Sequence, residues 1–143
     1  MSNKSNGSTF EQTFAELLSE HGFWAHVLQD NRNGQPFDVI ASRNGATYVF
    51  DCKDCQKEKF QLSRIEENQN NAMTLWAKTG NHPGIFAIQL SETIFVIAHK
   101  TLMILKDQGL KQIGIHELKR YGRTIEQWLA SKDQMDKWVD SCR

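Results

Sequence analysis

The sequence predicts an α/β domain, in which helices cover a mixed β-sheet. Short runs rich in Val, Ile, Phe and Tyr are joined in pairs by turn signals along the middle of the chain. Amphipathic stretches with apolar residues at helical spacing lie before, between and after these runs. A chain of 143 residues can form one domain with a complete hydrophobic core. We therefore expect a single domain over residues 9–143, preceded by a polar, disordered tail at residues 1–8.

Each expected element has a local signal. The first helix covers residues 9–20, with Phe10, Phe14 and Leu18 on its apolar stripe, and Gly22 follows its end. Strands are expected at residues 23–28, 37–41, 48–53, 85–90 and 93–98, with turns at 29–35, 44–45 and 91–92. A second helix is expected at 63–78 and a short one ending near 106, while 112–118 fits either a helix or a strand.

The last helix is the best marked. Thr124 is its expected N-cap, and Gln127 completes a capping box. Six apolar residues fall on one face of this helix: Ile125, Trp128, Leu129, Met135, Trp138 and Val139. For the tryptophans of the sequence, packing in the core or against a second subunit is the expected role.

Composition narrows the class of protein. The 17 Lys and Arg residues balance 17 Asp and Glu residues, so any contact with DNA must come from local patches. No apolar run has the length of a membrane span, and no signal peptide opens the sequence. Three cysteines, an odd number, argue against a disulfide framework. These features favour a cytoplasmic protein that does not enter a membrane.

The most informative residues are the acids of the first hairpin. Asp38 opens one apolar strand, and Asp51 and Lys53 lie in the next. Residues i and i+2 of a strand project from the same face, so Asp51 and Lys53 point together while Cys52 points away. Ionised groups on a buried strand are costly unless they pair or bind a metal or phosphate. The arrangement suits a divalent-metal site that cuts a phosphodiester; a turn aspartate and a structural ion pair are the simpler alternatives.

Both flanking helices bring polar residues toward the same place. Glu11 lies nearer to the apolar stripe of the first helix than Glu16 or Glu20, so it can reach a site at the helix–sheet boundary. Its alternative role is to complement the helix dipole. Gln69 occupies a core position of the second helix, where a buried amide needs partners. Either the acidic site or the backbone could supply them.

Together these motifs resemble the PD-(D/E)xK nuclease superfamily, and within it the RecU-type Holliday junction resolvases. The resemblance runs from Phe10 to Ile104. It rests on these segments: Phe10-Glu11, Pro36-Phe37-Asp38-Val39-Ile40, Asp51-Cys52-Lys53, Phe60-Gln61-Leu62-Ser63-Arg64-Ile65, Asn68-Gln69 and the hairpin at 85–97.

The resemblance implies a restriction-endonuclease-like fold, a Mg²⁺-dependent site and a homodimer, with Mn²⁺ as a substitute metal. Asp38 and Asp51 would ligate the metal, and Gln69 would hold a ligand or water. Lys53 would orient the attacking water and offset phosphoryl charge, and Glu11 would add an outer or second-metal contact. The sequence departs from the RecU pattern in having Asp51 instead of glutamate, Pro36 instead of a hydroxyl residue, and a short turn at 29–35 instead of a protruding stalk.

Two further groups of residues carry weaker signals. Lys57, Lys59 and Arg64 follow the expected site and could track a phosphate backbone, or could form a solvated charged loop. Cys52 and Cys55 have the C-x-x-C form, but Cys142 is isolated and no second pair completes a zinc site.

We therefore expect a Mg²⁺-dependent DNA endonuclease, a Holliday junction resolvase or related branched-DNA nuclease of recombination and repair. A non-catalytic DNA-binding module that keeps a nuclease fold is the first alternative, and a C-x-x-C redox or zinc protein is the second. Net neutrality and the missing stalk favour the non-catalytic module, whereas the retained acids and lysine oppose it.

Overall fold

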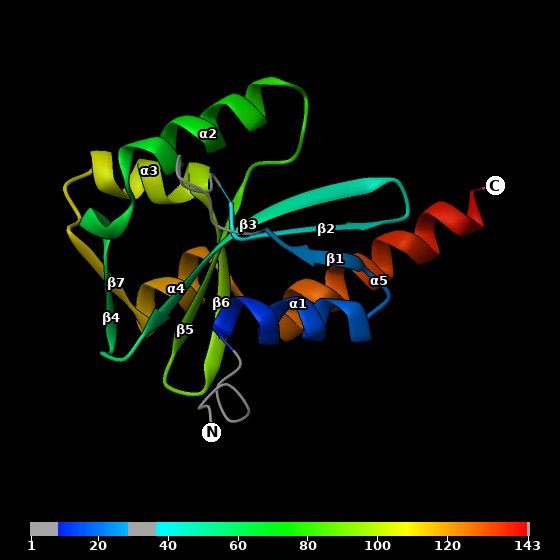
Figure 1. Ribbon diagram of the computed structural model, residues 1–143, viewed down its shortest axis with the longest axis horizontal. Helices are drawn as coiled ribbons and strands as arrows, with labels where there is room; N and C mark the ends of the chain where they lie inside the picture. The colour runs from blue at the N-terminus through cyan, green and yellow to red at the C-terminus, as the bar shows by residue number, and fades with distance from the viewer. Residues whose placement is uncertain (1–8, 29–36, 143) are drawn as a thin grey trace.

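A computed structural model describes residues 9–28 and 37–142 (Figure 1). Its centre is a six-stranded sheet of order β1-β2-β3-β5-β6-β8. The strands are β1 (Trp24–Val27), β2 (Val39–Arg43), β3 (Ala46–Cys55), β5 (Ile85–Leu90), β6 (Thr93–Ala98) and β8 (Arg123–Thr124). Only the β3–β5 pair is parallel within this sheet. The predicted mixed sheet is confirmed; the expected tail at 1–8, the turn at 29–35 and Pro36 lie outside the described residues.

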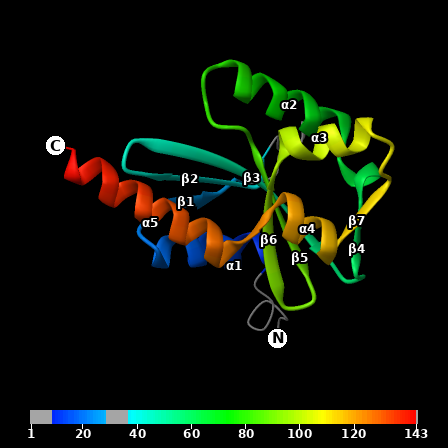
Figure 2. The same ribbon diagram turned by 180° about the vertical axis from the view of Figure 1, so that it is seen from behind.

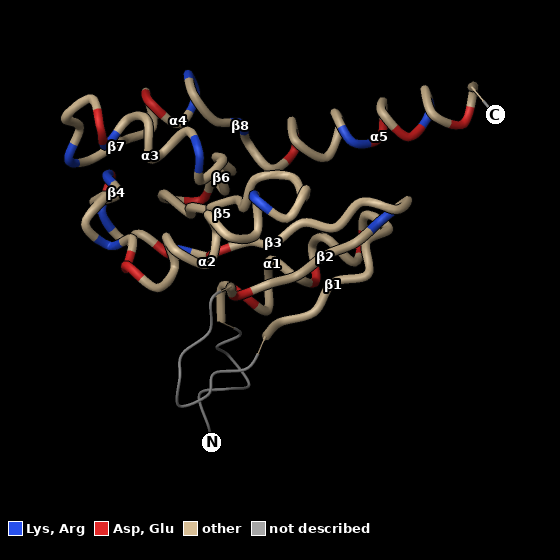
Figure 3. The backbone as a smooth tube through the Cα atoms, turned by 90° about the horizontal axis from the view of Figure 1, so that it is seen from above, with Lys and Arg blue, Asp and Glu red and all other residues tan. Residues whose placement is uncertain are grey.

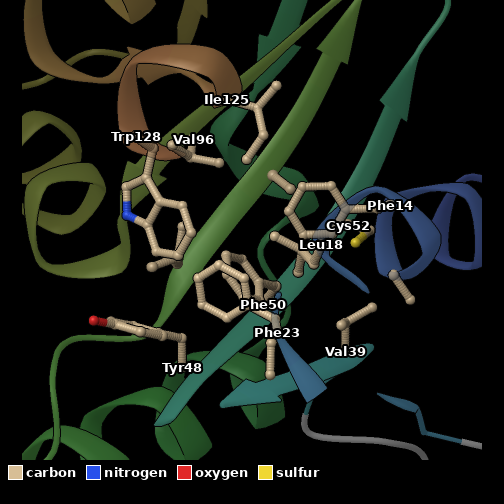
Figure 4. Close-up of a cluster of buried hydrophobic side chains, with 14 of the residues drawn as sticks. Phe14, Leu18, Phe23, Val39, Tyr48, Phe50, Cys52, Val96, Ile125 and Trp128 are labelled. Atoms are coloured by element: carbon tan, nitrogen blue, oxygen red, sulfur yellow. The ribbon is translucent and has the colours of Figure 1, made fainter. Parts of the chain in front are cut away.

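Helices cover both faces of this sheet. They are α1 (Phe10–Glu20), η2 (Leu62–Arg64), α2 (Glu67–Lys78), α3 (His99–Asp107), α4 (Ile115–Tyr121) and α5 (Ile125–Ser141). Helices α1 and α5 lie on one side, and α2 and α3 lie together on the other (Figures 1 and 2). Phe14, Phe50 and Trp128 belong to the core on the α1 and α5 side (Figure 4). Met73 and Phe86 belong to the second core, under α2 and α3.

Both predicted hairpin turns contain a residue with positive φ. Asn44 and Gly45 have positive φ values of 52° and 80°, as a tight turn between antiparallel strands requires. Ser91, with φ of 53°, turns the chain between β5 and β6. The Asn44-Gly45 turn joins β2 and β3, at which Asp38 and Asp51 lie, and so helps to set their register.

The second helix begins later than predicted. Residues 62–64 form the short helix η2, and Ile65 then takes an extended conformation, with φ −80° and ψ 106°. Helix α2 therefore starts at Glu67, with Glu66 as its N-cap. Ile65 is buried, but it belongs to this connecting turn and not to helix α2.

The region left open at 112–118 contains both kinds of structure. Residues Gln112–Gly114 form β7, which pairs with β4 (Lys59–Gln61) in a separate two-stranded sheet, and α4 follows at once. Strands of three residues have too few alternations to be recognised locally. Their pairing joins parts of the chain that are far apart in sequence.

Within the described chain, only the start of the apolar face of the last helix is buried. Thr124 and Gln127 do form the predicted capping box, and Ile125, Trp128 and Leu129 are buried. Trp138, however, is 66% exposed, and Met135 and Val139 are exposed as well. The cause is visible in Figure 1, where the end of α5 extends away from the sheet.

Charges of both signs are distributed along the described chain (Figure 3), in keeping with the net charge of zero. Within residues 9–28 and 37–142, no helix has the length and apolar character needed to span a membrane.

Candidate active site

Strand β3 presents Asp51 and Lys53 on one face of the sheet. The parallel register with β5 sets Asp51 beside Phe86 and Lys53 beside Ile88, two residues of the core under α2 and α3. Cys52, between them, belongs to the opposite core. The predicted alternation along this strand is therefore confirmed.

Asp51 is the most deeply buried acid of the site. Its side chain is 1% exposed, and Lys53 Nζ lies 3.3 Å from its Oδ1. This contact is an ion pair without hydrogen-bond alignment, and neither oxygen of Asp51 has a hydrogen-bond partner among the described residues. Burial raises the pKa of Asp51 to about 7, against the lowering effect of Lys53. The charges of Asp38 and Glu66 raise this pKa further.

Asp38 stands where β2 begins. The antiparallel register pairs Val39 with Phe50, so Asp38, one residue earlier, comes opposite Asp51. Its Oδ2 accepts a hydrogen bond of 2.7 Å from the backbone N–H of Cys52. This hydrogen bond fixes the carboxylate of Asp38 against strand β3. The charge of Asp38 also raises the pKa of Asp51. The hairpin therefore brings the two predicted acids together.

Gln69 joins helix α2 to the site. Its Oε1 accepts a hydrogen bond of 3.4 Å from Lys53 Nζ and one of 3.2 Å from the backbone N–H of Glu66. The two roles considered from the sequence, a partner for the site and a partner for the backbone, are thus filled by the same oxygen. As the third residue of the helix, Gln69 caps α2 and positions Lys53.

The donor set fits a hard divalent cation. Asp51 has two buried oxygens without hydrogen-bond partners, and the carboxylate of Asp38 faces the same side of the hairpin. Among the described residues, no group of three or more His, Cys, Asp or Glu side chains is arranged to hold a metal. Mg²⁺ keeps several waters and needs only one or two protein carboxylates, so a two-acid site is sufficient for it.

Glu11 is not part of this pair. It lies in the first turn of α1. Burial raises the pKa of Cys52, and the charges of Asp38, Asp51 and Glu11 raise it further, so Glu11 acts on the same strand segment as the two acids. Glu66, whose charge raises the pKa of Asp51, was not predicted from the sequence. Its spacing of three residues from Gln69, typical of an N-cap with its capping partner, was the available signal.

The three basic residues named for nucleic-acid contact differ in their surroundings. Lys57 and Lys59 are exposed, in the turn before β4 and at its first residue. The guanidinium of Arg64 lies 5.7 Å from the ring centre of Phe60 and donates a hydrogen bond of 3.2 Å to Cys55 Sγ. All three residues are exposed, but Arg64 alone among them has these side-chain contacts in the described chain.

The C-x-x-C motif has no redox geometry. Cys52 and Cys55 are free and belong to the two different cores. Burial raises the pKa of both thiols, which is the opposite of what a reactive cysteine requires.

A sheet of this order, with an acid on one strand and acid-x-lysine on its neighbour, is the arrangement of the PD-(D/E)xK class of nuclease folds. Residues 32–136 match the family described as RecU, recombination protein U. The chain belongs to the RecU family.

Two archaeal proteins extend the comparison. Over 58 residues the chain is 33% identical to the crossover junction endodeoxyribonuclease Hjc of Methanocaldococcus jannaschii. That match spans 41% of this chain and 41% of the relative's length. The solved structure of Hjc from Archaeoglobus fulgidus, a Holliday junction resolvase, matches with a TM-score of 0.63 at 17% identity, covering 85% of this chain and 93% of that one. The predicted restriction-endonuclease-like fold is confirmed by this likeness.

Proposed function

We propose that the chain is a divalent-metal-dependent endonuclease that hydrolyses phosphodiester bonds in branched DNA, with four-way junctions as its substrate. The observation that carries this proposal is the convergence of Asp38, Asp51 and Lys53 on one side of the β2–β3 hairpin. Membership of the RecU family and the likeness to Hjc support it. Recombination and DNA repair are the processes in which such an activity belongs.

Asp38 and Asp51 would hold the metal, with Mg²⁺ as the physiological ion and Mn²⁺ as a substitute. The bound cation would lower the pKa of a coordinated water and stabilise charge on the phosphoryl group. Ionised Asp51 needs such a partner, because both of its oxygens are buried without hydrogen bonds in the described chain. The position of Gln69 fits a role in holding Lys53, or a water beside it, better than direct ligation, since its oxygen already accepts two hydrogen bonds.

Lys53 would place its ammonium beside a phosphoryl oxygen and orient the attacking water. Its position between Asp51 and Gln69 keeps that ammonium at the site. Glu11 would act from α1 as an outer contact. Lys57, Lys59 and Arg64 would follow the DNA backbone beyond the cleaved bond.

The oligomeric state and the location complete the proposal. A homodimer would present two such sites to the two strands cut at a junction, and the exposed Trp24 and Trp138 offer apolar surface for subunit contact. The cytoplasm is the expected location, where the buried thiols stay reduced.

The direct test uses purified protein with labelled four-way junction, duplex and single-stranded DNA, with and without Mg²⁺. Cleavage of the junction that requires Mg²⁺ and exceeds cleavage of the duplex is the expected result. Binding of junction DNA without cleavage at any Mg²⁺ or Mn²⁺ concentration would instead identify the non-catalytic DNA-binding module.

A further inference from the structure

A pocket lies on the α5 side of the sheet. Its volume is about 260 Å³, and it forms where the segment before β5, the end of β6 and the start of α5 meet. Its lining includes Tyr48, His82, Tyr121, Arg123, Trp128 and Lys132. Tyr48 belongs to the same core as Phe50 and Cys52, so the pocket and Asp51 lie on opposite faces of β3. It is therefore separate from the proposed metal site.

Two buried aromatic residues turn polar atoms toward this pocket. Tyr48 is 4% exposed and Trp128 is 7% exposed. Figure 4 shows the hydroxyl oxygen of Tyr48 and the indole nitrogen of Trp128 on the same margin of the cluster, away from Phe14 and Cys52. Neither atom has a hydrogen bond to another described residue, and neither is sealed from solvent as the Asp51 oxygens are. Both groups can therefore donate to a ligand in the pocket.

Two cations line the same space. Lys132 Nζ lies 5.0 Å from the ring centre of Tyr48 and 5.1 Å from that of Trp128, which holds the ammonium against the aromatic wall. Burial lowers the pKa of Lys132, and the positive charges of Arg123 and Arg43 lower it further. An anion placed between Lys132 and Arg123 would relieve this repulsion.

Two acids of α5 near Lys132 in the sequence form ion pairs with Arg43 instead. Asp133 and Asp136, on the same helix, lie 3.1 Å and 2.9 Å from the guanidinium of Arg43. Asp136 attracts Lys132 at longer range, but neither Lys132 nor Arg123 forms an ion pair with another residue in the described part of the chain. The pocket thus combines two unpaired cations with two neutral donors.

We propose that this pocket binds a phosphate group, carried by a free mononucleotide or by the end of a DNA strand. The hydroxyl, indole, ammonium and guanidinium groups supply donors from several directions, and a phosphate can accept from all of them. A carboxylate has only two oxygens, so it would accept hydrogen bonds from fewer of these donors. The volume leaves room for the group attached to the phosphate. This site is independent of the proposed nuclease chemistry, because none of its residues contacts Asp38, Asp51 or Lys53 through the interactions described above.

The test is a binding measurement without divalent metal. The indole N–H signal of Trp128 in a ¹H–¹⁵N NMR spectrum, assigned with Trp128→Phe, reports directly on the pocket. Inorganic phosphate, dAMP, and one oligonucleotide with and without a 5′-phosphate are added separately. We expect saturable movement of this signal, and affinity about tenfold weaker or worse in Arg123→Gln and Lys132→Gln. Tyr48→Phe, which keeps the ring packing, should weaken binding less.

Lys137→Gln is the matched control, because it removes an exposed charge from the same helix outside the pocket. Tighter binding of dAMP than of inorganic phosphate would identify the free nucleotide, and a preference for the 5′-phosphorylated oligonucleotide would identify the strand end. The proposal is overturned if the Trp128 signal does not move with any of these ligands. It is equally overturned if Lys137→Gln weakens binding as much as Lys132→Gln does.

Discussion

The carboxylate of Asp51 lies 3.3 Å from the ammonium of Lys53, yet the pKa of Asp51 is raised to about 7. One cation does not compensate for burial together with the charges of Asp38 and Glu66. The hairpin therefore holds an unfavourable electrostatic arrangement that a second cation would relieve.

Replacing Asp51 by asparagine should abolish Mg²⁺-dependent cleavage while the fold is retained. The substitution keeps the size of the side chain and removes a buried charge, so the metal-free protein should gain up to about 4 kcal/mol of unfolding free energy at pH 8. Mg²⁺ should raise the melting temperature of the wild type and leave that of the variant unchanged. Thermal denaturation with and without Mg²⁺, followed by the junction assay, measures both effects.

Asp54→Asn is the control for this prediction, since Asp54 is an exposed acid on the same strand. It should keep both cleavage and the stabilisation by Mg²⁺. Retained Mg²⁺-dependent cleavage in Asp51→Asn would remove this residue from the active site.

The metal-free protein should lose stability as the pH rises from about 4 to about 7. The folded pKa of Asp51 is higher than its ordinary value of 3.8, so the folded state binds more protons than the unfolded state in this range. The loss should be on the order of 4 kcal/mol for the full shift, and it should vanish in Asp51→Asn. Urea denaturation at several pH values measures it.

Metal binding should show the opposite dependence on pH. The cation binds ionised Asp51, so its affinity should fall about tenfold per pH unit below pH 7, and binding at pH 6 should release a proton. Calorimetry in buffers of different ionisation enthalpy detects this proton. Affinity for Mg²⁺ that is constant between pH 5.5 and 8 would contradict the assignment of Asp51 as a ligand.

Features encoded over a few residues were predictable from the sequence. The Asn44-Gly45 turn, the alternation of Asp51 and Lys53, and the capping box at Thr124 all involve neighbours in the chain, so local geometry determines them. The β4–β7 pair was missed because it joins three-residue strands through distant partners such as Phe60 and Ile113. No local pattern carries that information.

The candidate site was likewise predictable where it depends on neighbouring residues, and not where it depends on distant ones. The strand period predicted that Asp51 and Lys53 share a face, but the hydrogen bond from the Cys52 backbone to Asp38 depends on the register of two strands. Glu66, whose charge acts on Asp51, is the N-cap of α2, which begins after an extended residue at Ile65. The uninterrupted helix predicted at 63–78 would instead place Glu66 within the helix.

Removing the side-chain amide of Gln69 should impair catalysis more than folding. Gln69→Ala deletes the hydrogen bond to Lys53 and one capping interaction of α2. We expect a loss of about 1 kcal/mol in unfolding free energy and a fall of about tenfold or more in kcat, because Lys53 is less well positioned. Single-turnover cleavage at saturating Mg²⁺ measures the rate.

Gln127→Ala provides a matched control for the cap. Gln127 accepts the same type of capping hydrogen bond, 3.0 Å from the backbone N–H of Thr124, in a helix remote from the acids. The Gln127→Ala variant should lose a similar amount of unfolding free energy and keep the wild-type cleavage rate. If both variants lose activity in proportion to their stability, Gln69 has only a structural role.

Lys57 and Lys59 should contribute to DNA binding without contributing to metal binding. Both are exposed next to the strand that carries Asp51 and Lys53, and a phosphate bound by either lysine would release a counterion. Changing both to glutamine should weaken junction binding and reduce the slope of log affinity against log salt by about 0.9 for each phosphate that is no longer neutralised.

Fluorescence anisotropy in Ca²⁺ at several salt concentrations gives this slope. The control variant Lys78→Gln, at the far end of α2, should leave the slope unchanged. A slope that is the same in the double variant and the wild type would place the DNA path on another surface.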